Sequence, residues 1–388
     1  MTIDRDQDHA ALVDAIERVC GRFDDGYWLA CDRDAAFPRD FHKAMAEGGW
    51  LGITMPEELG GAGLRVTEAA LMMKTVTASG GAFAAASAIH VNLFVAHAIV
   101  DHGTPDQKAR MLPPLMRGEH KTCFGVTEPD AGLDTTRIRT FARRDGEKYI
   151  VNGQKIWTSS AQVASHIVLL ARTTPYEECT KKTRGLSLFY TPIDRSRIEV
   201  REIPKMGRAA VDTNQVFIEN LEVPVEDRIG EEGEGFHYLL DSLNPERILV
   251  AMEAIGIGFD AVRRAAKYAG ERVVFGRPIG QNQSIQHPLA ESWMELRAAE
   301  LMAMEAARKY DAGEPCGAEA NAAKYLAAEA AFKACSNAVR THGGMGYAKE
   351  FDVERLLREA MIPVLAPVSQ QMILNFISER VLGLPRSY

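Results

Sequence analysis

Residues Phe124 to Asp134 read FGVTEPDAGLD and place an aromatic ring, a Thr hydroxyl and two turn-forming glycines in one short segment. A loop of this composition can line a planar cofactor, because it offers an apolar wall beside a hydrogen-bonding group. Further on, residues Tyr149 to Ser160 read YIVNGQKIWTSS, in which β-forming residues flank Asn152-Gly153. That pattern predicts a β-hairpin with its turn at Asn152-Gly153 and with Trp157 and two hydroxyls at the end of its second arm.

The chain on either side of these segments divides into three parts. Between Lys121 and Val225 apolar and polar residues alternate, which is typical of half-buried strands and predicts a small antiparallel β domain. Before and after this region apolar residues recur at helical spacing. We therefore expect an α+β fold with an N-terminal helical domain (1–118), a middle antiparallel β domain (119–230) and a C-terminal four-helix bundle (231–388).

The C-terminal part is Ala-rich and predicts helices that exceed the usual length, over Phe236–Tyr268, Pro288–Asp311 and Ala318–His342. Gly256 and Gly258 form a G-x-G inside the first of these patterns. A dinucleotide-binding fingerprint requires such glycines between a strand and a helix, and here they lie within a helix. We interpret them as small residues that allow close helix packing.

Composition argues against several classes of function. The 388 residues carry a net charge of −8, with 45 Lys and Arg interspersed among 53 Asp and Glu, so no surface for nucleic acid is expected. No run of 18 consecutive apolar residues occurs, which argues against a membrane span, and the N-terminus is acidic, unlike a secretory leader. The six cysteines are scattered without metal-ligand spacing. We expect buried, reduced thiols, no metal site and a cytoplasmic protein.

Taken with four further segments, the two loops resemble the acyl-CoA dehydrogenase family. These segments are PEELGGAGL (Pro56–Leu64), GTPDQKARML (Gly103–Leu112), ERVVFG (Glu271–Gly276) and THGGMGY (Thr341–Tyr347). Any one motif alone would be weak, but six motifs in the family's order span nearly the whole chain. The resemblance implies an FAD-dependent oxidoreductase that acts on acyl-CoA thioesters, assembles as a homotetramer and passes electrons to an electron-transfer flavoprotein.

The resemblance also implies which residues contact the flavin. The two loops would line its ring, whereas ERVVFG and the glycine-rich turn would serve the FAD of a neighbouring subunit. The implied cofactor-binding residues are Phe124, Val126, Thr127, Trp157, Thr158, Ser159, Arg272, Phe275, Gln283, Arg340, Gly343, Gly344, Val368 and Gln370. Without the other motifs, the second loop would be interpreted as part of an ordinary β domain with a buried Trp, and the glycine-rich turn as a helix terminator.

The expected reaction needs a carboxylate against the α-proton of the thioester, because that C–H is a poor acid in water. In many relatives the base is a Glu near the C-terminus, but the matching residue here is Ala366. Isovaleryl-CoA and long-chain members instead place a Glu before an Arg on the first helix of the C-terminal domain. Glu246 precedes Arg247 at that place, so the resemblance implies Glu246 as the base. The alternative is a solvated or salt-bridged helix Glu.

Substrate contacts are implied less fully. In relatives a backbone N–H at the later position polarises the thioester carbonyl, and Ala366 retains that N–H. Pro367 and Val368 replace the Gly and Thr usual after it, and Leu133 replaces a Ser that touches the CoA arm. The implied substrate-binding residues are Leu133, Asn244, Arg247, Ala366, His90 and Phe94.

The acyl pocket is expected to accept a short, branched or cyclic acyl group, because a ring at His90 or Phe94 could shorten it. Core packing for Phe94 and a hydrogen-bonded imidazole for His90 are the alternatives. Two further functions stay open: a flavin-dependent oxidase or lyase on the same fold, and a non-catalytic acyl-CoA binding protein.

Overall fold

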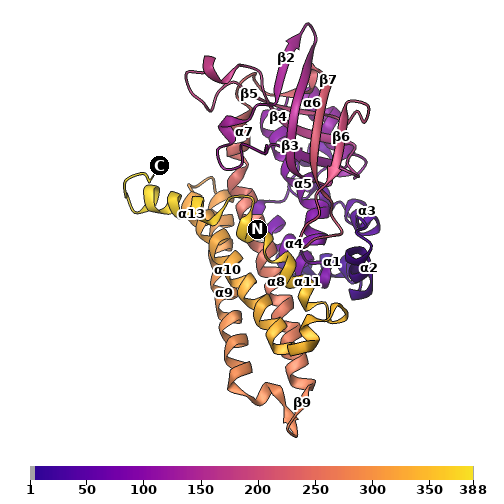
Figure 1. Ribbon diagram of the computed structural model, residues 1–388, viewed down its shortest axis with the longest axis vertical. Helices are drawn as coiled ribbons and strands as arrows, with labels where there is room; N and C mark the ends of the chain where they lie inside the picture. Colours follow the sequence, from indigo (N-terminus) through magenta and orange to yellow (C-terminus); the bar gives the residue numbers. More distant parts are fainter. Residues whose placement is uncertain (1–4, 388) are drawn as a thin grey trace.

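The N-terminal part is helical in the computed structural model, which describes residues 5–387 (Figure 1). Its helices are α1 (Arg5–Cys20), α2 (Asp25–Arg33), α3 (Arg39–Glu47), α4 (Val66–Val76), α5 (Ala82–His102) and α6 (Pro105–Met116). Two of them begin at start signals in the sequence: Pro38 precedes α3, and the Thr104 hydroxyl caps α6 by accepting from the Gln107 amide at 3.2 Å. Most residues of α5 are buried, so this helix forms the centre of the domain.

The middle domain is an eight-stranded sheet in the order β6-β7-β3-β2-β4-β5-β8, with β1 paired to β4. The strands are β1 (Thr122–Gly125), β2 (Phe141–Asp145), β3 (Lys148–Ser159), β4 (His166–Arg172), β5 (Leu186–Pro192), β6 (Ile198–Glu202), β7 (Thr213–Pro224) and β8 (Arg228–Ile229). Most neighbours are antiparallel, as predicted, but β4 pairs in parallel with both β1 and β2.

The predicted hairpin at Asn152-Gly153 is wrong. β3 continues through both residues, and the turn lies earlier, at Gly146, where β2 passes into β3. Asn152 instead pairs with Asn220 of β7: its Oδ1 accepts from the Asn220 amide at 2.9 Å, and the register shifts beside it. A Cβ on Gly153 would lie 2.4 Å from the Thr140 hydroxyl, so this glycine serves a close strand crossing inside a bulge.

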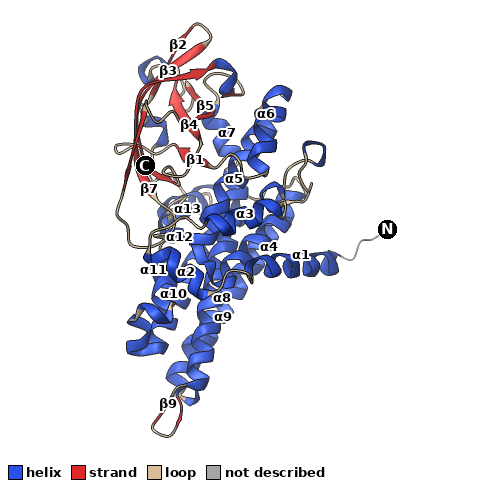
Figure 2. Cartoon of the chain, turned by 90° about the vertical axis from the view of Figure 1, so that its right-hand side faces the viewer, coloured by secondary structure: helices blue, strands red, loops and turns tan. Residues whose placement is uncertain are grey.

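The C-terminal domain is helical, as predicted, and its long helices extend away from the sheet (Figure 2). Its elements are α7 (Gly235–Asp241), α8 (Leu243–Glu271), β9 (Val273–Val274), β10 (Arg277–Pro278), α9 (Gln283–Asp311), α10 (Gly317–His342), α11 (Val353–Glu359), α12 (Ile362–Leu365) and α13 (Gln370–Phe376). The single helix predicted over Phe236–Tyr268 is two helices, with the break at Ser242. α8, α9 and α10 are the long members, and the short α11 packs against α10 and α8.

Gly256 and Gly258 serve close packing, as predicted. A Cβ on Gly256 would lie 2.3 Å from the carbonyl oxygen of Lys74, and one on Gly258 would lie 2.5 Å from the Leu296 side chain. Larger residues would separate α8 from α4 on one side and from α9 on the other.

Two helical stretches, Val66–His102 and Val353–Val381, are long and apolar enough by length and composition to cross a membrane. The sequence-based expectation of no membrane span did not anticipate them. In the first, 72% of the apolar window is buried inside the protein, as in the core helix of a globular fold, and in the second the share is 22%. The six cysteines are free and buried, which confirms their interpretation as buried thiols.

Candidate active site

Helix α5 is the common neighbour at the candidate site: it contacts β1 and α8 directly and is linked to the end of β3 through Arg208. The rings of Phe94 on α5 and Phe124 on β1 meet edge to face, with centroids 5.2 Å apart. Arg208, between β6 and β7, donates to Ser87 of α5 at 2.8 Å and to Ser159 of β3 at 2.9 Å. These contacts bring the two segments predicted to line the flavin against α5, which carries two of the predicted substrate residues.

The loop after β1 is fixed to β3 by a buried ion pair. Lys155 donates to Glu128 at 2.9 Å and to the carbonyl oxygen of Val126 at 3.0 Å, while the Ile156 amide donates to the carbonyl oxygen of Thr127 at 2.9 Å. Burial opposes the charge of Glu128, but Lys155 together with the hydrogen bonds from Thr140 and Arg139 outweighs it and lowers the pKa of this carboxyl. Phe124, Val126 and Thr127 therefore stand on a rigid loop, as positioning of a ring system requires.

The end of β3 presents Trp157 outward. Its backbone is left-handed (φ +61°) within a register shift of the strand, and 58% of the residue is exposed. The alternative of an ordinary buried Trp is therefore wrong. Beside it, the buried hydroxyls of Thr158 and Ser160 lack hydrogen-bond partners among residues 5–387, and Ser159 accepts from Arg208.

Glu246 lies in the first turn of α8 and is half-buried. Within the described part of the chain, its carboxylate makes no ion pair or side-chain hydrogen bond, so the alternative of a salt-bridged helix Glu is not supported. Burial raises the pKa of Glu246, while the charges of His90 and Arg247 oppose the rise. A carboxylate that is desolvated and unpaired has the properties of a general base.

Sequence reasoning missed three charged residues here: Glu253 and Lys324, whose charges act on Glu246, and Arg208, whose charge acts on His90. Lys324 of α10 donates to the carbonyl oxygen of Val368 at 2.7 Å, and burial lowers its pKa to about 8. All three come from different parts of the chain or from a later turn of α8, so no local motif marks them. Charge patterns in the sequence cannot reveal such long-range neighbours.

The alternatives for the two α5 residues are confirmed. Phe94 is 8% exposed and belongs to the apolar core, and the His90 imidazole is hydrogen-bonded to Glu253 at 2.6 Å. Both residues still lie at the candidate site. Phe94 contacts the Phe124 ring there, and the charge of Glu246 acts on His90.

The C-terminal loop differs from the prediction at Ala366. Its N–H donates to the carbonyl oxygen of Ile362 at 2.9 Å as the last bond of α12, so it is not free to polarise a thioester. Gln370 is buried at the start of α13, and its Nε2 has no partner among residues 5–387. Leu133 is 68% exposed on the loop after β1, and Asn244 accepts from Arg247 at 3.0 Å.

The second group of predicted cofactor residues lies at the opposite end of the molecule. Arg272 and Phe275 belong to the β9–β10 hairpin at the tip of the long helices, and Gln283 begins α9 (Figure 1). The Tyr268 and His342 rings stack at 4.2 Å, which places the end of α10, with Arg340, Gly343 and Gly344, near the same tip. Within a single chain, the two groups of predicted cofactor residues are therefore far apart. Phe275 is fully exposed, and the side chains of Arg272 and Arg340 have no carboxylate partner among the described residues.

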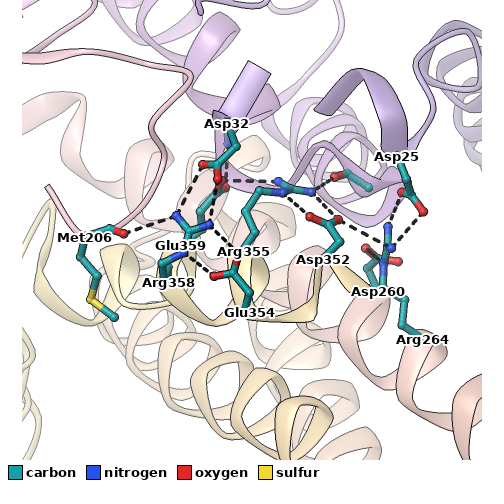
Figure 3. A network of polar contacts seen from close by, with 12 residues as sticks. Asp25, Asp32, Met206, Asp260, Arg264, Asp352, Glu354, Arg355, Arg358 and Glu359 are labelled. Carbon is teal, nitrogen blue, oxygen red and sulfur yellow. Dashed lines mark hydrogen bonds and ion pairs between the residues drawn. The ribbon is translucent and has the colours of Figure 1, made fainter. Parts of the chain in front are cut away.

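An ionic network around α11 links this helix to α2, α8 and the segment before Arg208 (Figure 3). Arg355 of α11 donates to Asp352 at 2.6 Å and to the carbonyl oxygen of Gly80, also at 2.6 Å. Arg358 pairs with Asp32 of α2 and reaches the carbonyl oxygen of Met206, two residues before Arg208. Glu359 accepts from the Ala84 amide at the start of α5, so α11 ties the site's helix and loop together.

The residues present fit a polar, planar cofactor. Three donors lack a hydrogen-bond partner among residues 5–387 and could bond to the heteroatoms of a flavin ring: Thr158 Oγ1, Ser160 Oγ and Gln370 Nε2. Phe124 and Trp157 supply aromatic surface. Among residues 5–387, no group of three or more His, Cys, Asp or Glu side chains has the arrangement of a metal site.

A helical, β and helical architecture around such a site defines a class of flavoprotein oxidoreductases, and three family models match it. They describe the acyl-CoA dehydrogenase N-terminal domain (residues 6–119), middle domain (123–221) and C-terminal domain (233–382). The chain belongs to the acyl-CoA dehydrogenase family, a family of flavoproteins, and is an oxidoreductase that acts on acyl-CoA.

Relatives match over nearly the full length. The acyl-CoA dehydrogenase FadE12 of Mycobacterium tuberculosis is 36% identical over 387 residues, covering 98% of each chain. Butyryl-CoA dehydrogenase from Megasphaera elsdenii has a TM-score of 0.90 at 27% identity, covering 98% of this chain and 99% of that one. A structure described as the electron transferring flavoprotein of Acidaminococcus fermentans matches with a TM-score of 0.90 at 31% identity, covering 97% and 98%.

Proposed function

We propose that this chain is an FAD-dependent acyl-CoA dehydrogenase in which Glu246 removes the α-proton of the thioester. The observation that carries the proposal is the half-buried, unpaired carboxylate of Glu246, on which the charges of His90 on α5 and Lys324 on α10 act. FAD, when bound, supplies a hydride acceptor for the β-hydrogen. Because burial raises the pKa of Glu246, the carboxylate is a stronger base than one in water, and activity should fall as pH drops through this pKa.

The proposed flavin site combines residues of two subunits. Phe124, Val126, Thr127, Trp157 and Ser159 would line the ring, and the tip at Arg272, Phe275 and Arg340 would reach the phosphates and adenosine of a neighbour's FAD. Large apolar side chains exposed on α9, α10 and α13 support assembly, here proposed as a homotetramer; they include Trp293, Met294, Leu301, Leu326 and Leu374.

We expect Arg272→Ala to lower the flavin content of the purified protein, with the dissociation constant for FAD rising about tenfold or more. The physical reason is the loss of a cation that has no protein carboxylate partner and can pair with a pyrophosphate. Flavin absorbance per chain after gel filtration measures the effect. Arg277→Ala on the same hairpin is the matched control, because Arg277 donates to Asn282 and has no proposed cofactor contact. Unchanged flavin content in Arg272→Ala would count against the shared site.

The nucleotide end of CoA is proposed to occupy a cavity of about 440 Å³ that is lined by Asp130 and Arg137, which lie on either side of Leu133 in the sequence. Tyr176 lines this cavity, with the Arg172 guanidinium 5.0 Å from its ring centroid. Arg172 itself is tied to the carbonyl oxygen of Ile138 at 2.9 Å. Arg139 also lines the cavity, and its side chain makes no hydrogen bond or ion pair with residues 5–387, so it remains available for a phosphate.

Arg139→Gln is therefore expected to raise the KM for acyl-CoA about five- to tenfold, as loss of one charged hydrogen bond predicts. The KM for the corresponding acyl-pantetheine, which lacks the nucleotide, should not change. Steady-state kinetics with both thioesters measure the difference, and Arg143→Gln on the neighbouring strand β2 is the control. Equal effects on both thioesters would place the nucleotide elsewhere.

The finer assignments rest on the same site. A short, branched or cyclic acyl group is proposed because the packed Phe94 and Phe124 rings leave little room between α5 and β1. An electron-transfer flavoprotein is proposed as the acceptor, and the Acidaminococcus neighbour supports it. The six free thiols suit a reducing compartment, so a cytoplasmic location is proposed. Fast reoxidation of the reduced flavin by oxygen would favour an oxidase on this fold.

A further inference from the structure

His90 and Glu253 form a buried pair that the proposed mechanism does not use. The His90 Nδ1 lies 2.6 Å from Glu253 Oε1, and the two side chains are 14% and 4% exposed. The pair joins α5 to α8. A buried carboxylate and imidazole at this distance form a charge-assisted hydrogen bond, which fixes both side chains.

The pair lies on the same side of α8 as Glu246. Glu253 follows Glu246 by seven residues, which is two helical turns and about 10 Å of rise, so both carboxylates face α5. The electrostatic contacts agree, because the charges of His90 and Glu253 both act on Glu246. The pair is therefore part of the environment of the base.

Charged groups face this region from each element that packs there. They are His90 on α5, Glu246, Arg247 and Glu253 on α8, Lys324 on α10 and Arg208 between β6 and β7. Burial alone would lower the pKa of His90, but Glu253, through its charge and hydrogen bond, and Glu246 raise it. The imidazolium is thus favoured, and its charge balances that of Glu253.

We propose that His90 and Glu253 are positioning residues for the base: the pair holds α8 against α5 and cancels the charge of a second carboxylate beside Glu246. The proposal rests on the function proposed for Glu246. In this role both residues act through Glu246, and neither of them accepts the proton. If the imidazole is removed, Glu253 remains as a buried negative group that disfavours ionisation of Glu246.

The test is the pH profile of flavin reduction by acyl-CoA, measured anaerobically on the holoenzyme. Glu246 must be ionised to accept the proton, so any rise in its pKa moves the acid limb to higher pH. In His90→Gln we expect the acid limb to move up by about one pH unit. In Glu253→Gln, and in the double variant His90→Gln/Glu253→Gln, the second carboxylate is gone and the limb should return close to the wild-type position.

The outcomes separate the two proposals. A uniform loss of rate at every pH in His90→Gln, or an equal shift in all three variants, would mean that the pair only supports the fold and would overturn the inference. Should His90→Gln fail to fold, His90→Asn takes its place. The proposal then predicts an acid limb at higher pH in His90→Asn and at the wild-type position in Glu253→Gln. Acid limbs at the same pH in these two variants would reject it. Full activity of Glu246→Gln would instead reject the proposed function itself.

Discussion

Glu246→Gln is expected to lower the rate of flavin reduction by acyl-CoA about 10³-fold or more, because an amide of the same shape cannot accept the α-proton. Binding of acyl-CoA should be nearly unchanged, since the fold and the rest of the site are retained. Anaerobic stopped-flow absorbance of the bound flavin measures the rate. Chemical reduction of the same flavin should proceed as in the wild type.

The control for this substitution is Glu329→Gln on α10, where the carboxylate is exposed and makes no ion pair among the described residues. It should leave the rate at the wild-type value. A rate for Glu246→Gln within a few fold of the wild type would leave the chain without its proposed base and would favour a protein that binds acyl-CoA without catalysis.

Arg355→Met is expected to lower the free energy of unfolding by about 3 to 5 kcal/mol, the usual effect of removing one partner from a buried ionic network. The Arg355 side chain is 1% exposed, and its loss leaves the buried Glu359 without its cation and leaves Asp352 with only the more distant Arg264 at 3.6 Å. The substitution also frees the carbonyl oxygen of Gly80. Urea unfolding of the holoenzyme, followed by far-UV circular dichroism, measures the change.

Arg308→Met is the matched control on α9. Arg308 pairs with Glu305 at the surface, 57% exposed, and such pairs contribute little. Its unfolding midpoint should stay near that of the wild type. If Arg355→Met has the same unfolding midpoint as Arg308→Met, the network in Figure 3 does not hold α11 in place. The network would then not explain how the Arg208 loop is positioned.

The division into helical, β and helical parts could be predicted because it depends on local periodicity, which each segment carries in its own residues. The parallel pairing of β1 with β4 could not, since the partners are far apart in sequence. The prediction of a turn at Asn152-Gly153 was wrong because it too depends on a distant partner. Asn220 on β7 pairs with Asn152, and a bulge takes the place of the expected turn.

The candidate site divides in the same way. Phe124, Trp157 and Glu246 lie in motifs that can be recognised from sequence. Arg208 and Glu253 act through contacts between separate elements, and no spacing along the chain marks them. Ala366 shows the limit of residue matching, because whether its N–H is free depends on how α12 ends.

Proton exchange tests the role of Glu246 most directly. A saturated acyl-CoA that reduces the wild-type flavin is incubated anaerobically with the protein in deuterated water, and label at the α-carbon is followed by mass spectrometry. We predict that the wild type exchanges the α-proton and that Glu246→Gln does not. Exchange at the wild-type rate in Glu246→Gln would place the base on another residue and contradict the mechanism.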